Sequence, residues 1–142
     1  MNAAHNPSSF ANPQEIAKAC RGALPAAAEK GVELFNAGEY WLAHEALEAA
    51  WLAEPGPARH LYKGILQAGV AYLHVQRGNF IGLVKMYERS RVWLAPWPPI
   101  CRTLDIGQLR QDIAAVVAAA GRLGPARLAE FDPALLKPLR RV

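Results

Sequence analysis

The sequence contains only two cysteines among its 142 residues. Cys20 and Cys101 lie far apart and lack Cys-x-x-Cys spacing, so the sequence indicates neither a zinc site nor a framework of several disulfides. A single bridge between the two is compatible with the sequence. Two reduced, partly buried thiols are nevertheless the favoured interpretation, because cytosolic proteins rarely keep structural disulfides.

Long apolar runs and strand-like alternation are also absent. No run approaches the roughly 18 apolar residues of a membrane span, and residues 1–11 have neither the basic start nor the apolar stretch of a secretion signal. We therefore expect a cytoplasmic protein without a membrane partner. No segment shows the period-two alternation of apolar and polar residues that is typical of a β-strand, which predicts an all-α fold.

Basic residues are in small excess and are unevenly distributed along the chain. Residues 1–56 contain three Lys/Arg and seven Asp/Glu, whereas residues 57–142 contain thirteen Lys/Arg and five Asp/Glu. The basic residues are scattered, with no tight run and no recognised nucleic-acid motif. We expect these charges to form a solvated surface, and we do not expect nucleic acid as a partner.

The length and the helix-start signals predict one helical domain. A chain of 142 residues, 52% of them hydrophobic, fits a single domain. Residues 1–11 are expected to form a flexible leader and residues 12–142 the domain. Capping residues, prolines and glycines delimit the expected helices. Their ranges are 13 to about 21, 26–36, 39–53, 58–76, 80–94 and about 105–122, with one short helix after Pro133. The prediction is a compact bundle of two central helical hairpins with flanking N- and C-terminal helices.

The four tryptophans are assigned by their local sequence. Residues 95–99, rich in proline, are expected to form a rigid extended connector between helices. Trp97 lies between prolines in this connector and is the best candidate for an exposed aromatic side chain. Trp41, Trp51 and Trp93 are expected in the core, which is where such residues at helical spacing usually lie.

Two of the expected helices carry polar residues in apolar surroundings. His44, Glu48 and Trp51 line up on one helix face, because helical residues four apart are neighbours. Gln67 and His74 share a phase on the following long helix, which is apolar almost all round and should therefore be buried. An enclosed polar group without a partner costs about 1–3 kcal/mol. We therefore expect these side chains to pair across the helical hairpin in one shared polar centre.

Three interpretations of this centre are open. It is a buried hydrogen-bond network that fixes helix register, a site for a ligand or partner, or a metal or catalytic site. The metal interpretation assigns His44, Glu48 and His74 as ligands of a divalent ion, since two imidazoles and a carboxylate suit Zn²⁺, Fe or Mn²⁺. Glu45 is then the candidate catalytic acid or base, and Gln67 orients a ligand. The sequence indicates no other cofactor.

A longer motif carries a family resemblance. It reads Phe35-Asn36-x-Gly38-x-Tyr40-x-x-Ala43-His44-Glu45-x-Leu47-Glu48-x-x-Trp51, followed by Gly64-Ile65-Leu66-Gln67-Ala68 and His74-x-x-x-Gly78-Asn79-x-x-Gly82. Over about residues 30–95 the chain resembles the domain of unknown function 309 family. The resemblance implies a small all-helical protein and supplies no activity.

The resemblance also marks individual positions. The residues that fall on the family pattern and are candidates for binding are His44, Glu45, Glu48, Trp51, Gln67 and His74. The family commonly has an acidic residue just before Ala43, where this chain has Leu42. Lys63 stands where family members often have glutamine or another polar residue.

The residues and the resemblance together lead to one main hypothesis and one alternative. The main hypothesis is an uncharacterised small helical domain with a buried His/Glu/Gln centre that acts as a binding or interaction module. Its partner would be a protein or a small molecule, and a homodimer through an apolar helix face is compatible with the sequence. The alternative is a metal-dependent enzyme, a hydrolase or an oxygen-chemistry protein, that uses His44, Glu48 and His74.

Overall fold

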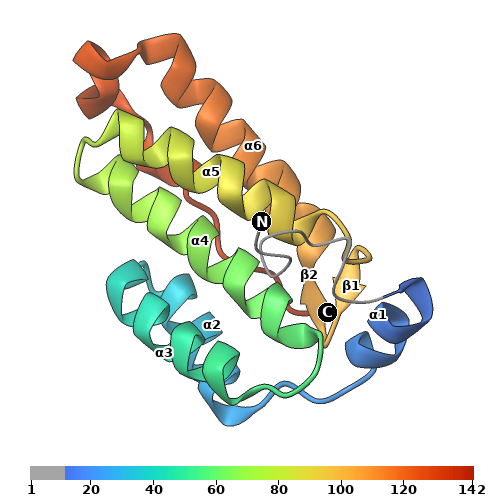
Figure 1. The fold of residues 1–142 in the computed structure, drawn as a ribbon. Coiled ribbons are helices and arrows are strands. Elements are labelled where there is room, and N and C mark those ends of the chain that lie inside the picture. Colours follow the sequence, from blue (N-terminus) through green and yellow to red (C-terminus); the bar gives the residue numbers. More distant parts are fainter. Residues whose placement is uncertain (1–11) are drawn as a thin grey trace, which may run out of the picture.

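The computed structural model describes residues 12–142 and shows an all-α fold with one small hairpin of strands (Figure 1). Its helices and strands are α1 (Pro13–Cys20), α2 (Ala26–Asn36), α3 (Tyr40–Ala53), α4 (Ala58–Gln76), α5 (Phe80–Leu94), β1 (Ile100–Cys101), β2 (Leu104–Asp105), α6 (Ile106–Leu123) and the short 3₁₀ helices η3 (Pro125–Glu130) and η4 (Pro133–Leu135). The predicted fold class is confirmed. The expected leader, residues 1–11, lies outside the described residues.

The helix boundaries follow the caps that the sequence contains. The side chain of Asn12 accepts a hydrogen bond from the Glu15 backbone N–H at 2.8 Å, at the start of α1. Asn79 caps α5 in the same way, and Asp105 accepts from the Gln108 N–H at 2.9 Å at the start of α6. Each cap satisfies a backbone donor that has no partner within the first helical turn. The ranges expected for α2, α4 and α5 agree with the structure, and of these three helices α5 has a side-chain cap.

The centre of the bundle is α4. Thirteen of its 19 residues are buried, and it lies between α3 on one side and α5 on the other (Figure 1). A helix that is apolar almost all round is stable in water only when neighbours cover most of its surface. The neighbours come close at Gly64, where an added Cβ would lie 2.7 Å from a side-chain carbon of Leu94 on α5.

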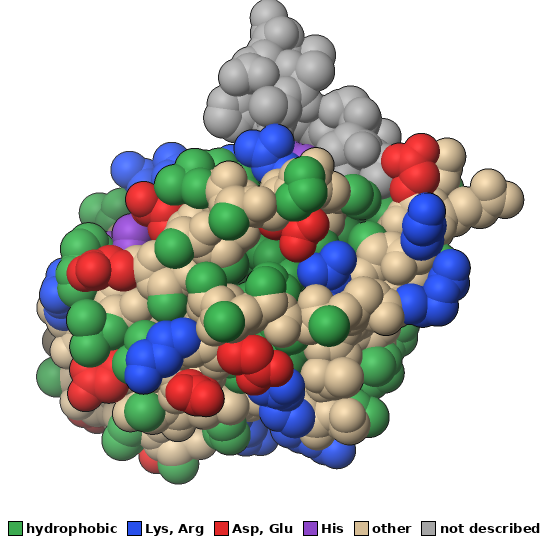
Figure 2. All heavy atoms as spheres, turned by 90° about the horizontal axis from the view of Figure 1, so that it is seen from below, with side chains coloured by type: hydrophobic (Ala, Val, Ile, Leu, Met, Phe, Trp, Pro, Cys, Tyr) green, Lys and Arg blue, Asp and Glu red, His purple; other side chains and the backbone are tan. Residues whose placement is uncertain are grey.

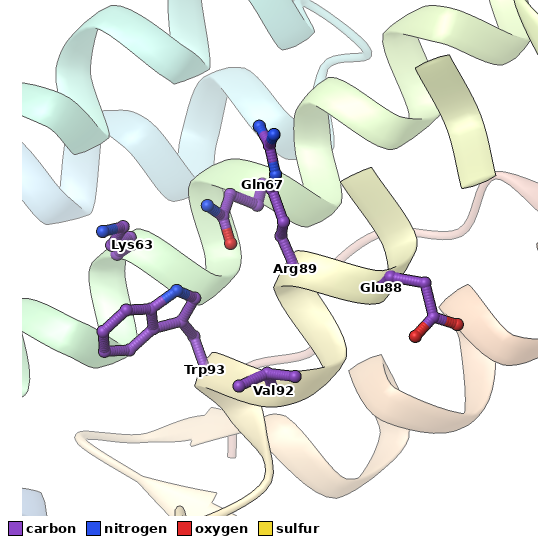
Figure 3. Close-up of a pocket in the computed structure, with 6 residues that line it drawn as sticks. All are labelled: Lys63, Gln67, Glu88, Arg89, Val92 and Trp93. Carbon is purple, nitrogen blue, oxygen red and sulfur yellow. The ribbon is translucent and has the colours of Figure 1, made fainter. Parts of the chain in front are cut away.

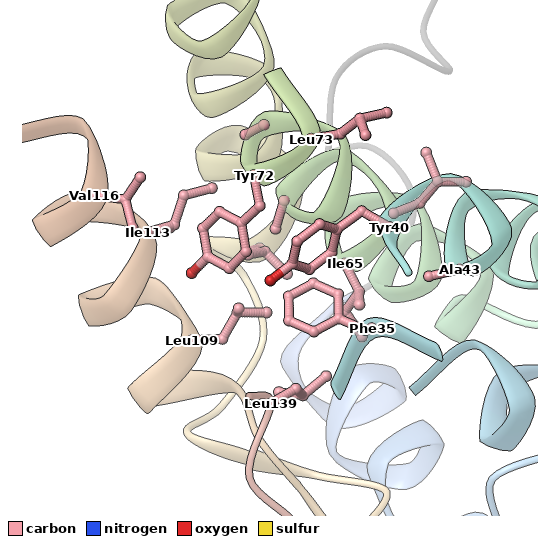
Figure 4. Packing of buried hydrophobic residues seen from close by; sticks show 14 of the residues in the cluster. Phe35, Tyr40, Ala43, Ile65, Tyr72, Leu73, Leu109, Ile113, Val116 and Leu139 are labelled. Atoms are coloured by element: carbon pink, nitrogen blue, oxygen red, sulfur yellow. The ribbon is translucent and has the colours of Figure 1, made fainter. Parts of the chain in front are cut away.

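An aromatic cluster joins α2, α3 and α4. The rings of Phe35, Tyr40 and Tyr72 lie 5.4–5.6 Å apart between centroids, and two of the three pairs meet edge to face (Figure 4). Edge-to-face packing is a favourable arrangement of aromatic rings. Gly69 leaves room for this cluster, since a Cβ at that position would lie 3.3 Å from the Phe35 ring. The first helical hairpin is thereby fixed against α4.

The C-terminal segment returns along the bundle to the hairpin and binds back to α2 (Figure 1). The Asn36 side chain donates to the Leu139 carbonyl at 3.1 Å and accepts from the Leu139 N–H at 2.7 Å. Arg141 forms two hydrogen bonds of 2.7 Å with Glu29. The expected short helix after Asp132 is η4, and η3 was not predicted.

The all-α fold contains one small pair of strands that was not predicted. β1 and β2 form an antiparallel pair of two residues each, with Cys101 opposite Leu104. Their turn consists of Arg102 and Thr103, which have positive φ angles of 49° and 68°. Two residues are too few to produce a recognisable alternation, and turns of this kind usually carry Gly or Asn. No local pattern in the sequence therefore predicts this hairpin.

The prediction of reduced cysteines is also wrong, because Cys20 and Cys101 form a disulfide that joins α1 to β1. Next to it, Arg102 Nε donates to the Ala19 carbonyl at 2.7 Å. Arg102 Nη1 donates to Tyr62 Oη at 2.8 Å and forms an ion pair of 3.1 Å with Glu54. Burial of Tyr62 raises its pKa to about 12. The disulfide and this polar network hold α1 and the hairpin against the ends of α3 and α4.

Two tryptophan assignments need correction. Trp97 is only 2% exposed, because Arg110 donates to the carbonyls of Leu94 and Trp97 and folds the proline-rich connector onto α6. Trp41 is 50% exposed, since the face of α3 that meets α4 is formed by other residues. Trp93 is buried, as expected.

Charges of both signs are mixed on the surface. Figure 2 shows Lys and Arg side chains interspersed with Asp and Glu over the face seen from below. Among residues 12–142, no helix is long and apolar enough to cross a membrane.

We predict that the disulfide contributes strongly to stability. Replacing Cys20 and Cys101 together by serine removes a cross-link across 81 residues and should lower the free energy of unfolding by about 4 kcal/mol. Urea unfolding of both proteins measures this difference. Thiol titration of the denatured, unreduced wild type should find no free thiol. Two titratable thiols in that sample would contradict the bridge.

Candidate functional site

The two α3 residues of the predicted centre contact each other rather than α4. His44 Nε2 lies 3.7 Å from a carboxylate oxygen of Glu48, and the two side chains are 24% and 46% exposed. The His44 ring stacks on Trp41 with 4.9 Å between centroids. Glu45 is exposed. These residues form a polar stripe along the outer side of α3.

The expected pairing across the hairpin is therefore not formed. The buried side of α3 consists of Tyr40, Ala43, Leu47 and Ala50. Consecutive residues of an α-helix are about 100° apart around its axis, so Glu48 is turned away from the residues that α3 buries and His44 lies at the edge of that face. Neither His44 Nδ1 nor Gln67 Oε1 has a hydrogen-bond partner. The correction follows from helical phase, since Tyr40, Ala43, Leu47 and Ala50 form the buried face of α3.

His74 lies on the opposite side of α4, towards α5. A Cβ at Gly82 would lie 2.8 Å from two carbons of the His74 ring, so the ring packs against the first turn of α5. Burial, with a smaller contribution from Arg77, lowers the pKa of His74. His74 is thus a half-buried neutral ring that packs between two helices.

The three residues predicted as metal ligands are accordingly not gathered about one point. Within residues 12–142, no group of three or more His, Cys, Asp or Glu side chains is placed so that it could hold a metal ion. A stable divalent site in a helical bundle needs at least three such ligands directed at one position. The observed pair of His44 and Glu48 falls short of that number.

Gln67, by contrast, faces a pocket between α4 and α5. The pocket has a volume of ≈ 660 Å³ and is lined by Lys63, Gln67, Glu88, Arg89, Val92 and Trp93 (Figure 3). Gln67 is 9% exposed, and its side-chain oxygen points away from α4 into the space bounded by Trp93 and Arg89 (Figure 3). We refer to these six residues as the α4/α5 pocket.

Aromatic rings hold Lys63 at one end of this pocket. Its Nζ lies 4.4 Å from the ring centroid of Trp93 and 5.1 Å from that of Trp51. The ammonium is attracted to the electron-rich faces of both indoles. Trp51 comes from α3 and Trp93 from α5, so Lys63 connects the two helices that flank α4. Trp51, a predicted binding residue, therefore contacts the pocket residue Lys63 without being part of the lining itself.

The pocket has a positive electrostatic environment. Burial, together with the nearby charges of Arg59 and Arg89, lowers the pKa of Lys63. Burial and the charges of Arg59 and Lys63 lower the pKa of His60 to about 4, and the His60 ring stacks on Trp93 at 5.0 Å. The one acidic residue of the lining, Glu88, forms an ion pair of 2.8 Å with Arg91.

Sequence reasoning identified only part of this site. Gln67 was found because it interrupts an apolar helix, and Trp51 because of its phase on α3. Lys63 precedes Gln67 by four residues and therefore lies on the same face of α4, which is a usable signal. Arg89 and Trp93 repeat that spacing on α5. Only the packing of the second helical hairpin brings the two pairs together.

The fold and this pocket define a small all-helical domain whose central helix and its C-terminal neighbour enclose a cationic pocket. Residues 28–86 match the model of the domain of unknown function 309 family, which confirms the resemblance of the sequence motifs. The matched segment is similar to that family, whose function is not established. It includes Lys63 and Gln67 and ends within α5, before Arg89. The comparison with curated proteins gave no match.

We predict an acid-sensitive contribution from His60. Its folded-state pKa of about 4 lies below the unfolded value of about 6.5. The unfolded chain therefore binds a proton first, and the stability contribution of neutral His60 is lost as the pH falls from 6.5 to 4. His60→Phe keeps a ring on Trp93, and its melting temperature should fall less than that of the wild type over this pH range. Equal slopes would contradict the assignment.

Proposed function

We propose that this protein is a binding module and that its ligand site is the α4/α5 pocket. The observation that carries the proposal is Gln67, which is nine-tenths buried with a side-chain oxygen that lacks a partner. Buried polar groups in folded proteins almost always have a hydrogen-bond partner, so an exception needs an explanation. A ligand that donates a hydrogen bond to this oxygen supplies one.

The dimensions and lining of the pocket support a small organic ligand. Its ≈ 660 Å³ fall within the range of roughly 300–1,000 Å³ that is typical of small-molecule sites. Trp93 and Val92 offer apolar contact, and a few polar groups converge on the same space. Such a combination gives affinity through apolar burial and orientation through hydrogen bonds.

A structural role for the polar residues explains the observations less well. A network that fixes helix register needs its members to be bonded to one another. Here Oε1 of Gln67 and the Nδ1 atoms of His44 and His74 have no partner. Unsatisfied groups lower stability, and proteins tolerate such losses where function requires them. The unpaired polar atoms therefore favour a binding role over a purely structural one.

We also propose a cytoplasmic location and a homodimer, both of which rest on the sequence. The disulfide between Cys20 and Cys101 removes one of the supports for the cytoplasm, since such bonds are typical of oxidising compartments.

The proposal predicts that Gln67→Met stabilises the free protein. Methionine has nearly the same shape and removes the unpaired oxygen, so the free energy of unfolding should rise by about 1 kcal/mol. The corresponding rise in melting temperature is about 3 °C, measurable by calorimetry. Gln76→Met, at an exposed position of the same helix, serves as the control and should change little.

The opposite result would identify a structural role. If Gln67→Met lowers the free energy of unfolding by 1 kcal/mol or more, the amide is bonded within the protein and the pocket is not held open for a ligand. The Gln76→Met control separates this outcome from a general effect of methionine on α4.

A further inference from the structure

If the α4/α5 pocket is a ligand site, as proposed above, its lining indicates the chemical class of the ligand. We infer that the α4/α5 pocket binds a small organic oxyanion, a carboxylate or a phosphate ester, that carries an N–H or O–H donor beside the charged group. Lys63 and Arg89 form ion pairs with the anionic group, and the side-chain oxygen of Gln67 accepts a hydrogen bond from the adjacent donor.

Lys63 is the first reason for an anion. Its ammonium is half-buried, lies over the faces of Trp51 and Trp93, and forms no ion pair with a carboxylate among residues 12–142. A half-buried charge is usually paired, because desolvation without compensation is unfavourable. The indole faces compensate for part of that loss. An anion in the pocket would supply the remaining partner.

Arg89 is the second reason. It lines the same pocket from α5, is exposed, and has no carboxylate partner within the described part of the chain. Glu88, which lines the pocket as well, directs its carboxylate away from the other labelled side chains and pairs with Arg91 (Figure 3). The pocket therefore contains two cations that no acid neutralises. A guanidinium also suits the two oxygens of a carboxylate or phosphate group, which it can bind in a bidentate manner.

Gln67 determines what must accompany the charge. Its unpaired oxygen is an acceptor, and a second acceptor placed against it would be repelled. The oxygen is shielded from solvent in the ligand-free protein. Binding therefore requires the exposed Arg89 side chain to move aside and uncover this oxygen. An oxyanion with an adjacent N–H group would thus satisfy the amide and both cations at once.

The apolar lining indicates that the ligand is organic rather than an inorganic ion. Trp93 is only 4% exposed, and Val92 beside it is 40% exposed. An inorganic ion contacting only Lys63 and Arg89 would leave this surface unused. An apolar or aromatic group attached to the anion would cover Val92 and the accessible edge of the pocket, and its burial adds about 25 cal/mol per Å².

The inference can be tested by titrating ¹⁵N-labelled protein with three probes. Hippurate has a carboxylate beside an amide N–H and an aromatic ring. N-benzoyl-O-phosphoethanolamine has the same ring and amide with a phosphate ester, and hippuramide is the neutral analogue of hippurate. We expect saturable shifts at residues 63, 67, 89 and 93 with hippurate or N-benzoyl-O-phosphoethanolamine, at least tenfold weaker with hippuramide. The stronger of the two anions identifies the carboxylate or the phosphate as the better match.

Charge variants complete the test. Lys63→Gln should weaken binding of the anionic probe at least tenfold, whereas Lys85→Gln should change it less than twofold. Lys85 is an exposed lysine of α5 outside the pocket lining, so its replacement removes the same charge from the same region. Arg89→Gln, at an exposed position, gives a second variant if Lys63→Gln does not fold.

The outcomes separate this inference from the proposed function. Equal binding of hippuramide and hippurate at the pocket would overturn the oxyanion and leave the binding module intact. Equal weakening by Lys63→Gln and Lys85→Gln would show a general effect of charge and overturn the role of Lys63. Absence of saturable shifts with all three probes would overturn the ligand class. The proposed binding function itself is tested without a ligand. It is overturned if the Gln67→Met variant is less stable than the wild type.

Discussion

The burial of α4 is the constraint on which the rest of the structure depends. Thirteen of its 19 residues are buried, and such a helix must be covered on most of its circumference before the domain is stable. The helices α3 and α5 provide this cover, with Leu94 of α5 close to Gly64 (Figure 1). Two polar side chains of α4, Lys63 and Gln67, line the α4/α5 pocket.

This arrangement explains how a mostly apolar domain can present charge in a defined place. Lys63 extends from the buried helix between indoles of the two flanking helices, which fixes the position of an otherwise flexible side chain. Its neighbours Arg59 and Arg89 add charge of the same sign. Positive charges in a pocket with apolar walls act through a less polar medium than water, and their attraction for an anion is correspondingly stronger. The unpaired amide oxygen of Gln67 adds selectivity, because it favours a ligand that donates a hydrogen bond.

The helices were predictable because their signals are local. Asn12, Asn79 and Asp105 cap helices in the structure as their positions in the sequence indicated. The bridge between Cys20 and Cys101 depends on a contact across 81 residues, for which the sequence has no comparable signal. The hairpin of β1 and β2 is local, but strands of two residues each are too short to show an alternation. In the site, the burial of Gln67 was predicted from the apolar character of α4. Its expected partner His44 does not pair with it. Each step of one residue along α3 turns the side-chain direction by about 100°, so a small error in helical phase changes which side chains meet α4.

A crystal structure of the protein, purified and crystallised without added ligand, would test the α4/α5 pocket as a ligand site. We expect that no protein group hydrogen-bonds to Oε1 of Gln67 and that no carboxylate pairs with Lys63. We also expect density for a retained molecule or ordered water in the α4/α5 pocket. A Gln67 amide bonded to a protein side chain, with Lys63 paired to an acidic residue and the pocket closed, would contradict this assignment.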